Sequence, residues 1–249
     1  MAAGAGAARN ERDYRVSHLL GKEVFDPAGI DFGRIQDIVI DMSDGDVRYA
    51  IISLNGDTAL DQIRYYAIPA RAFTLRNNNR LVMSVNNGAW RERSFPSDRW
   101  PDLRNPGYWS EVDHLSGFPA VQPTDAYFAH RASQVIGKKV QNVEGQALGV
   151  LRDIVIDMGA AKVRYAALDS EPGLARSGEL FRFPISSFMF REDRQGNLMI
   201  AQPLVLDVEP VMLMSMQGFM SDRWPGVDEP GSRPVRNSRH GGGNSLGTS

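Results

Sequence analysis

The chain has 249 residues, a length that accommodates one large domain or two small ones. Hydrophobic residues make up 42% of it and charged residues 23%, which is enough apolar material for a packed core. The lack of cysteine excludes disulfides, cysteine metal sites and thiol catalysis. With 28 basic and 30 acidic residues, the net charge of −2 argues against a protein that depends on non-specific attraction to phosphates.

The N-terminal segment, residues 1–16, is rich in alanine and glycine and is expected to be a disordered tail. It lacks the basic start and long apolar centre of a signal peptide, so a cytoplasmic location is the default expectation. No transmembrane helix is expected either, because the most apolar segment, 204–220, is interrupted by Asp207, Glu209 and Pro210.

The chain contains an internal repeat. A shift of 116 residues lays 17–50 on 133–166 without a gap, and 16 of the 34 positions are identical, where unrelated segments would share about two. The matching blocks include Asp-Ile-Val-Ile-Asp-Met at 37–42 and 153–158, Val-Arg-Tyr-Ala at 47–50 and 163–166, and Ser-Asp-Arg-Trp-Pro at 97–101 and 221–225. Such self-similarity indicates a tandem duplication of one small domain.

The repeat divides the chain into segments. The first copy spans 17–100 and the second 133–225, each with 10 basic and 11 acidic residues up to its terminal tryptophan. The linker 101–132 holds four prolines and the aromatic residues Tyr108, Trp109, Phe118, Tyr127 and Phe128, which predict packing against a neighbour rather than a free tether. The Gly/Ser/Arg-rich segment 226–249 is expected to be a disordered tail.

Within each copy the apolar runs are short and separated by turn residues. In the first copy, 35–40 and 47–54 are predicted strands joined by the hairpin loop 42–46, and 63–68, 72–75 and 80–85 continue the pattern. Because closing a sheet removes its exposed edges, we expect a small β-barrel rather than an open sheet. A short helix is predicted after each barrel, near 88–95 and with its apolar face on 211–219.

These motifs resemble those of the PRC-barrel domain family. The order Gly-Lys-x-Val, Gly-x-x-x-Gly, Asp-Ile-Val-Ile-Asp, Val-Arg-Tyr-Ala and a later proline occurs twice, at 21–73 and 137–188. The resemblance implies a mainly all-β protein of two tandem SH3-like barrels that serve in docking. The family includes the cytoplasmic part of the H subunit of the purple-bacterial photosynthetic reaction centre, the C-terminal domain of a ribosome maturation factor and archaeal cell-division adaptors, and none of these barrels is an enzyme by itself.

The acidic and histidine residues do not form a reaction site in the sequence. Asp37 and Asp41 would lie about 13 Å apart on one strand, too far to act on one bond. We expect the first to face solvent or pair with a cross-strand arginine, and the second to begin the hairpin turn. The second copy lacks counterparts of Asp44 and Asp46 in the hairpin loop, and no two histidines have metal-ligand spacing. The sequence therefore predicts no catalytic residue, no metal, no cofactor and no small-molecule substrate.

Two features are candidates for partner binding. Arginines gather late in the first copy, including Arg64, Arg71, Arg76 and Arg80, although pairing within the barrel is the simpler interpretation. Trp100 and Trp224 stand in the repeated Asp-Arg-Trp-Pro corners, where each could plug its own barrel or serve as a partner anchor.

The sequence therefore predicts a non-enzymatic adaptor that binds a protein partner, with two copies that provide avidity or bridge two partners. Two alternatives stay open: a peripheral reaction-centre H-like subunit in a membrane-associated complex, and a ribosome-assembly factor that binds RNA through the arginines of the first copy. Formation of a homo-oligomer is also left open.

Overall fold

The structure is a computed structural model that describes residues 13–56, 63–76, 80–85, 88–103, 105–120, 129–191, 199 and 201–227. The outer parts of both expected tails, residues 1–12 and 228–249, lie outside this range. The linker aromatics Tyr127 and Phe128 also lie outside the described residues.

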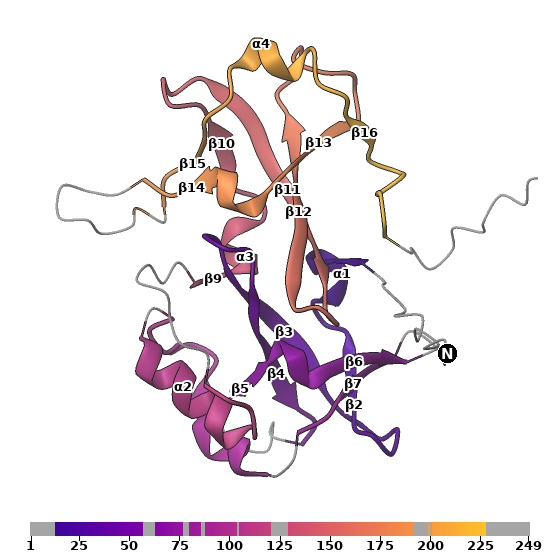
Figure 1. The fold of residues 1–249 in the computed structure, drawn as a ribbon, viewed down its shortest axis with the longest axis vertical. Helices are drawn as coiled ribbons and strands as arrows, with labels where there is room; N and C mark the ends of the chain where they lie inside the picture. The colour runs from indigo at the N-terminus through magenta and orange to yellow at the C-terminus, as the bar shows by residue number, and fades with distance from the viewer. Residues whose placement is uncertain are drawn as a thin grey trace, which may run out of the picture.

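Each copy folds into one curled sheet that resembles a barrel (Figure 1). The sheet of the first copy has the order β6-β7-β2-β3-β4-β5-β8, with the bounds β2 Glu23–Phe25, β3 Asp31–Asp41, β4 Val47–Leu54, β5 Arg64–Pro69, β6 Phe73–Arg76, β7 Arg80–Met83 and β8 Ser94–Pro96. The sheet of the second copy has the matching order β14-β15-β10-β11-β12-β13-β16, with β10 Lys139–Gln141, β11 Ala147–Asp157, β12 Lys162–Ser170, β13 Glu179–Phe183, β14 Phe188–Met189, β15 Leu204–Leu206 and β16 Phe219–Met220. The predicted mainly β architecture of two tandem barrel-like units is confirmed.

Short helical elements connect the strands. They are α1 Val16–Leu19, η2 Ala70–Ala72, η3 Ala89–Arg93, α2 Pro106–Leu115, α3 Ala132–Val135, η4 Ile185–Ser187 and α4 Pro210–Leu213. The longest is α2 in the linker, where Pro106 opens the helix and the Asn105 side chain accepts hydrogen bonds from the amides of Gly107 and Tyr108. The linker therefore packs on a neighbour, as its aromatics predicted, and it does so as a helix that the sequence analysis did not predict.

A repeated glycine allows the long strand of each copy to cross its neighbour closely. A Cβ atom built on Gly33 would lie 2.3 Å from the Ser53 carbonyl oxygen, and one on Gly149 would lie 2.0 Å from the Asp169 carbonyl oxygen. Gly149 also has a φ of 145°, which side chains disfavour. The sequence repeats glycine at this position because any side chain there would push two paired strands apart.

The two copies exchange their first strands. β1 (Asp13–Arg15) begins the first copy but pairs antiparallel with β11 of the second, with Tyr14 opposite Ile156. β9 (Ala129–Arg131) begins the second copy but pairs with β3 of the first, with His130 opposite Ile40. The helices that follow also cross over, since α1 packs on β11 and α3 packs on β3. The expected tail through residue 16 is therefore wrong for residues 13–16, which are held in the sheet of the other copy.

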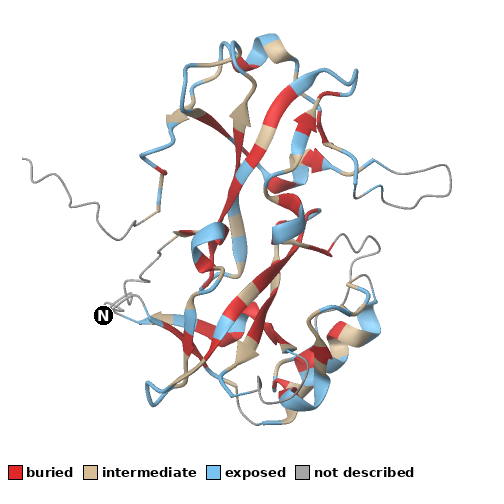
Figure 2. Ribbon diagram, turned by 180° about the vertical axis from the view of Figure 1, so that it is seen from behind, coloured by how far each residue is buried: buried red, intermediate tan, exposed pale blue. Residues whose placement is uncertain are grey.

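The hairpin tips of the two copies also pair with each other. The Val47 amide donates to the Ala161 carbonyl at 2.9 Å and the Val163 amide to the Gly45 carbonyl at 2.7 Å, and an Asp46–Lys162 ion pair lies beside them. One continuous apolar core runs through both copies and includes Tyr14, Leu19 and Ile38 as well as Leu148 and Leu168. Figure 2 shows buried residues along the long central strands of both units. The two repeats thus share a single interior.

Candidate partner-binding site

The repeated buried aspartates fasten the exchanged segments. Asp37 on β3 is fully buried, and its carboxylate accepts hydrogen bonds from the Ser133 amide at 3.2 Å, the Ser133 hydroxyl and the Arg131 Nε at 2.9 Å. Asp153 on β11 accepts the corresponding bonds from the amide and hydroxyl of Ser17. The expectation that Asp37 could face solvent is wrong, and the arginine that pairs with it comes from the exchanged strand β9.

The second aspartate of the repeated block begins the hairpin turn, as predicted. Asp41 accepts hydrogen bonds from the amide of Ser43 at 3.0 Å and from its hydroxyl at 2.6 Å. It also pairs with Arg48 at 3.0 Å. This carboxylate is committed to the loop that meets the other copy.

The two corner tryptophans, Trp100 and Trp224, lie on the outer faces of the sheets. Each indole N–H donates to a carbonyl three residues earlier, at 3.1 Å from Trp100 and 2.9 Å from Trp224. An arginine of the exchanged strand stacks on each ring: Arg131 at 3.8 Å from the Trp100 centroid and Arg15 at 4.7 Å from the Trp224 centroid. The indoles therefore join the two copies through cation–π contacts.

The four candidate arginines of the first copy do not share one environment. Arg64 donates to the hydroxyl and carbonyl oxygens of Ser94, at 2.7 and 3.0 Å, and so connects β5 to β8. Arg71 forms an ion pair with Asp113 in α2 and a hydrogen bond with the Pro119 carbonyl oxygen after that helix. Arg76 and Arg80 are exposed and lie opposite each other on β6 and β7, with Arg80 stacked 4.6 Å from the Phe25 ring centroid. Two of the four guanidinium groups are therefore hydrogen-bonded within the chain, and a third stacks on an aromatic ring.

In the first copy, the linker helix α2 covers the outer face of the sheet. The Trp109 ring stacks on Tyr49 with centroids 4.1 Å apart, and the Tyr49 hydroxyl donates to the Trp109 carbonyl at 3.3 Å. Val112 packs in the same cluster with Ala67 on β5. Arg71 on η2 pairs with Asp113 at 3.0 Å. The helix and the sheet thus form a second small core outside the barrel.

In the second copy, the described residues contain no counterpart of α2. Tyr165, which matches Tyr49, packs with Phe219 and Trp224, and its hydroxyl donates to the Pro225 carbonyl at 2.9 Å. Burial raises the pKa of the Tyr165 phenol to about 12, which keeps this donor protonated at neutral pH. Arg182 matches Ala67, and its guanidinium lies 5.9 Å from the Tyr165 ring centroid. Beside these residues is a pocket of about 440 Å³.

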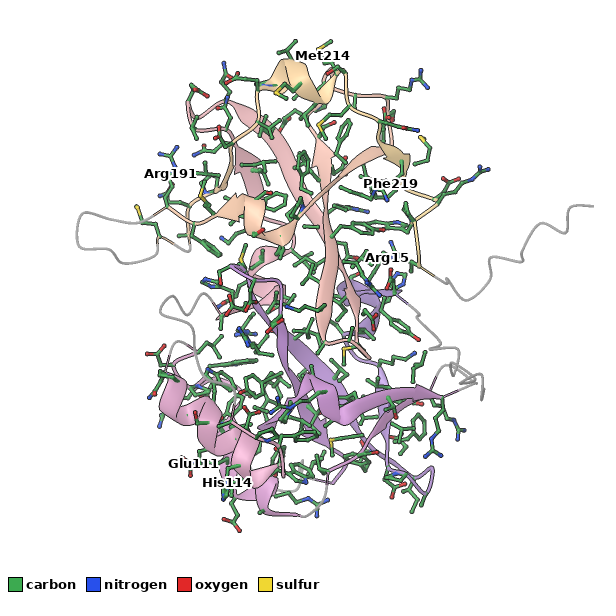
Figure 3. All side chains as sticks on the ribbon, viewed as in Figure 1. Arg15, Glu111, His114, Arg191, Met214 and Phe219 are labelled. Atoms are coloured by element: carbon green, nitrogen blue, oxygen red, sulfur yellow. The ribbon has the colours of Figure 1, made fainter. Side chains whose placement is uncertain are left out.

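The short helix α4 presents apolar side chains to solvent at the far end of the second copy. Val211 is 68% exposed, Met212 53% and Met214 65%, and these three residues are called the α4 surface below. Figure 3 shows Met214 at the end of the molecule, pointing away from the sheet. The predicted helix exists only over 210–213, and its expected apolar face is divided. Leu213 is buried and Met216 and Phe219 pack inward, whereas the α4 surface faces solvent.

The corresponding segment of the first copy, η3, is covered. Trp90 of η3 is buried and lies edge-to-face on Tyr66, with centroids 5.5 Å apart. The helix α2 packs on η3, and Arg93 forms an ion pair with Glu111 across that contact. The two copies therefore differ most on this side, where the first is covered by its linker helix and the second is open.

Some of these features carry a signal in the sequence. The pair Asn105-Pro106 is a helix start, followed by apolar residues at helical spacing, and it could have predicted α2. The open face of the second copy has no such signal, because exposure depends on what the linker covers after folding. Among the described residues, no group of three or more His, Asp or Glu side chains is placed to hold a metal ion. None of the helices in the described ranges is long and apolar enough to cross a membrane.

The fold and its repeated motifs agree with a comparison against known families. A model of the PRC-barrel domain matches residues 11–91 and 129–203, which together make up more than half of the chain. Both matches include the exchanged strand that opens each copy. A comparison with curated proteins found no match. The chain therefore belongs to the PRC-barrel domain family and contains two copies of that domain.

Proposed function

We propose that this protein is a non-enzymatic docking protein that binds the apolar surface of a partner protein through its second copy. The observation that carries the proposal is the α4 surface, where Val211, Met212 and Met214 are each more than half exposed within one turn of chain. Contiguous exposed apolar side chains on a soluble fold are typical of interaction sites. Methionine suits such a site because its unbranched side chain adapts to differently shaped partners.

The asymmetry between the copies supports the same proposal. In the first copy the equivalent segment, η3, packs against α2 and buries Trp90. In the second copy, no described segment of the chain lies over α4 in this way. A partner protein would provide the cover that the linker helix provides in the first copy. We expect this docking to take place in the cytoplasm, on a free partner or on the cytoplasmic side of a membrane complex.

The experiment is site-specific photocross-linking in a lysate of the source cells. A benzophenone amino acid is placed at position 212 or 214, and at Arg76 on the first copy as a control, and the lysate is irradiated either untreated or after treatment with RNase. We expect one protein to cross-link from 212 and 214 and not from 76. Loss of the product on RNase treatment, or equal cross-linking from 76, would favour the RNA-binding alternative. A product of twice the mass of this protein would show that the α4 surface contacts another molecule of the same protein.

The partner that cross-linking identifies is then purified, and its affinity for this protein is measured. Burying one methionine side chain contributes about 1.5–3 kcal/mol, so Met214→Asp is expected to weaken binding about tenfold or more. The matched control is Ile30→Asp, which changes an exposed apolar side chain of the first copy. Equal binding by both variants would contradict the assignment of the site to α4.

A further inference from the structure

On the first copy, the end of α2 and the turn after it cover the sheet beside η2 through contacts with Arg71. Arg71 on η2 contacts three groups of the linker: the carboxylate of Asp113 at 3.0 Å, the carbonyl oxygen of Pro119 at 2.7 Å and the ring of Phe118, whose centroid is 4.9 Å away. Asp113 is buried there, and Phe118 packs against the shared core. A carboxylate and an aromatic side chain, five residues apart, thus close the edge of the first copy.

The same place on the second copy is the open pocket. It lies between the hairpin tip at Asp44–Gly45 and the elements β12, β13 and η4. An offset of 115 residues aligns Pro69 with Pro184 and Phe73 with Phe188. With this offset Ser186 stands where the first copy has Arg71, and Ile185 where it has Ala70. The pocket therefore corresponds to the region that the end of α2 closes on the first copy.

The charges around the pocket leave one cation available. Arg164 is bonded to Asp157 at 2.6 Å and to Asp13 at 3.2 Å, and Asp44 pairs with Arg48 at 2.6 Å. Arg182 is exposed and makes no ion pair with any residue in the described ranges. Val163, Pro184 and Ile185 supply the apolar part of the lining. An occupant that complements this lining has one carboxylate for Arg182 and an apolar or aromatic side chain for the rest.

Within the described residues, no segment of the chain is left over to fill the pocket. The aromatic side chains of α2 are packed on the first copy. We therefore assign the occupant to a partner protein.

We propose that the pocket beside Arg182 receives a helical segment of a partner protein that carries a carboxylate and an aromatic side chain, as α2 and the turn after it do on the first copy. This inference rests on the proposed function only in that the occupant belongs to a protein. It concerns a different surface from α4, so the two can be tested separately. The carboxylate pairs with Arg182, and the aromatic side chain covers Val163 and Pro184.

The probe is a fluorescent peptide of residues 103–119 of this chain, stapled between positions 107 and 111, whose residues are both exposed on α2. The staple is needed because an isolated helix of this length is marginal in water. Fluorescence anisotropy of the peptide against the full-length protein is expected to show saturable binding. Arg182→Ala is expected to weaken it about fivefold, the upper range for a partly exposed ion pair. Arg76→Ala, at an exposed arginine of the first copy, is the matched control and should leave binding unchanged.

A gain of binding provides the sharper arm. Ser186→Arg restores the cation that meets Asp113 on the first copy, so the peptide is expected to bind this variant more tightly than the wild type. The gain should disappear with the peptide variant Asp113→Asn, and Phe118→Ala should weaken binding to both proteins.

Three results would overturn the proposal. They are no saturable binding to the wild type or to Ser186→Arg, equal affinity for Arg182→Ala and the wild type, and binding that appears only after removal of residues 228–249. The last result would identify the tail as the occupant. Cross-linking from position 214 does not depend on any of these variants. Failure of the peptide to bind the pocket would therefore not contradict the proposal that the α4 surface binds a partner.

Discussion

At the scale of single residues, the repeated Asp-Ile-Val-Ile-Asp block has a structural purpose. Asp37 and Asp153 are buried, and each binds a serine in the first turn of the other copy's exchanged helix, Ser133 and Ser17 respectively. A carboxylate that accepts several hydrogen bonds in the interior compensates the cost of its burial. Asp37 and Asp153 therefore hold the exchanged segments of the two copies in place.

Replacing these aspartates should destabilise the whole protein. Asp37→Ala leaves the Ser133 hydroxyl and the Arg131 guanidinium without their acceptor, and we expect it to lower the free energy of unfolding by about 3 kcal/mol. Asp153→Ala should cost a similar amount, because it leaves the amide and hydroxyl of Ser17 without their acceptor. Urea denaturation followed by circular dichroism measures both values.

The control for this prediction is Asp98→Ala, at an exposed turn position of the first corner. A surface substitution of this kind is expected to change stability by no more than about 0.5 kcal/mol. If Asp37→Ala were as mild as the control, the buried carboxylate would not be the fastening that its hydrogen bonds indicate.

At the scale of elements, the sequence predicted local structure better than pairing. The hairpin over 35–54 follows from its β-branched run and its Asp/Gly loop, and the structure has it as β3 and β4. The exchange of β1 and β9 could not be predicted in this way. A sequence repeat indicates that two segments have the same fold, but it does not indicate which strands pair. Both β1 and β9 fit the edge of either β3 or β11.

For the helices too, the sequence predicts the local pattern of side chains better than the contacts that this pattern makes. The segment 211–219 was expected to bury an apolar face, because alternating Val, Met and Leu residues are typical of a core helix. In the structure only the first turn is helical, and Val211, Met212 and Met214 face solvent. The side-chain pattern is typical of a covered segment, but the cover in the first copy is α2, and the described residues of the second copy contain no counterpart of that helix.

The exchanged strand offers a test at this scale. Deletion of residues 1–15 removes β1 and its pairing with 155–157 of β11, the burial of Tyr14 and the stacking of Arg15 on Trp224. We expect amide hydrogen exchange at 155–157 to become at least about tenfold faster, because loss of the strand weakens the second copy by more than about 1.4 kcal/mol.

The first copy supplies the internal control for that measurement. Residues 39–41 of β3 occupy the matching positions and keep their pairing with β9 in the truncated protein. Their exchange should change less than that of 155–157. Uniform acceleration of both segments would mean that β1 acts on global stability alone, and unchanged exchange at 155–157 would contradict the strand exchange.

At the scale of the molecule, the two PRC-barrel copies form one body. They exchange strands and helices, their hairpin tips are hydrogen-bonded, and one apolar core runs through both. The docking that we propose would benefit from this arrangement, since the α4 surface and the pocket beside Arg182 then keep a fixed position relative to each other. A partner that contacts both would meet a preorganised surface, which reduces the entropic cost of binding.

The most direct test of this account is differential scanning calorimetry of the full-length protein and of Gly149→Ala. We predict one transition whose calorimetric and van't Hoff enthalpies agree, and a shift of that whole transition to lower temperature in the variant, because its Cβ would meet the Asp169 carbonyl oxygen at 2.0 Å. Gly145→Ala is the control: it also has a positive φ, of 87°, but nothing lies within 4 Å of its Cβ position, so its shift should be smaller. Two separate transitions, with only one of them moved by Gly149→Ala, would contradict the claim that the copies fold as one unit.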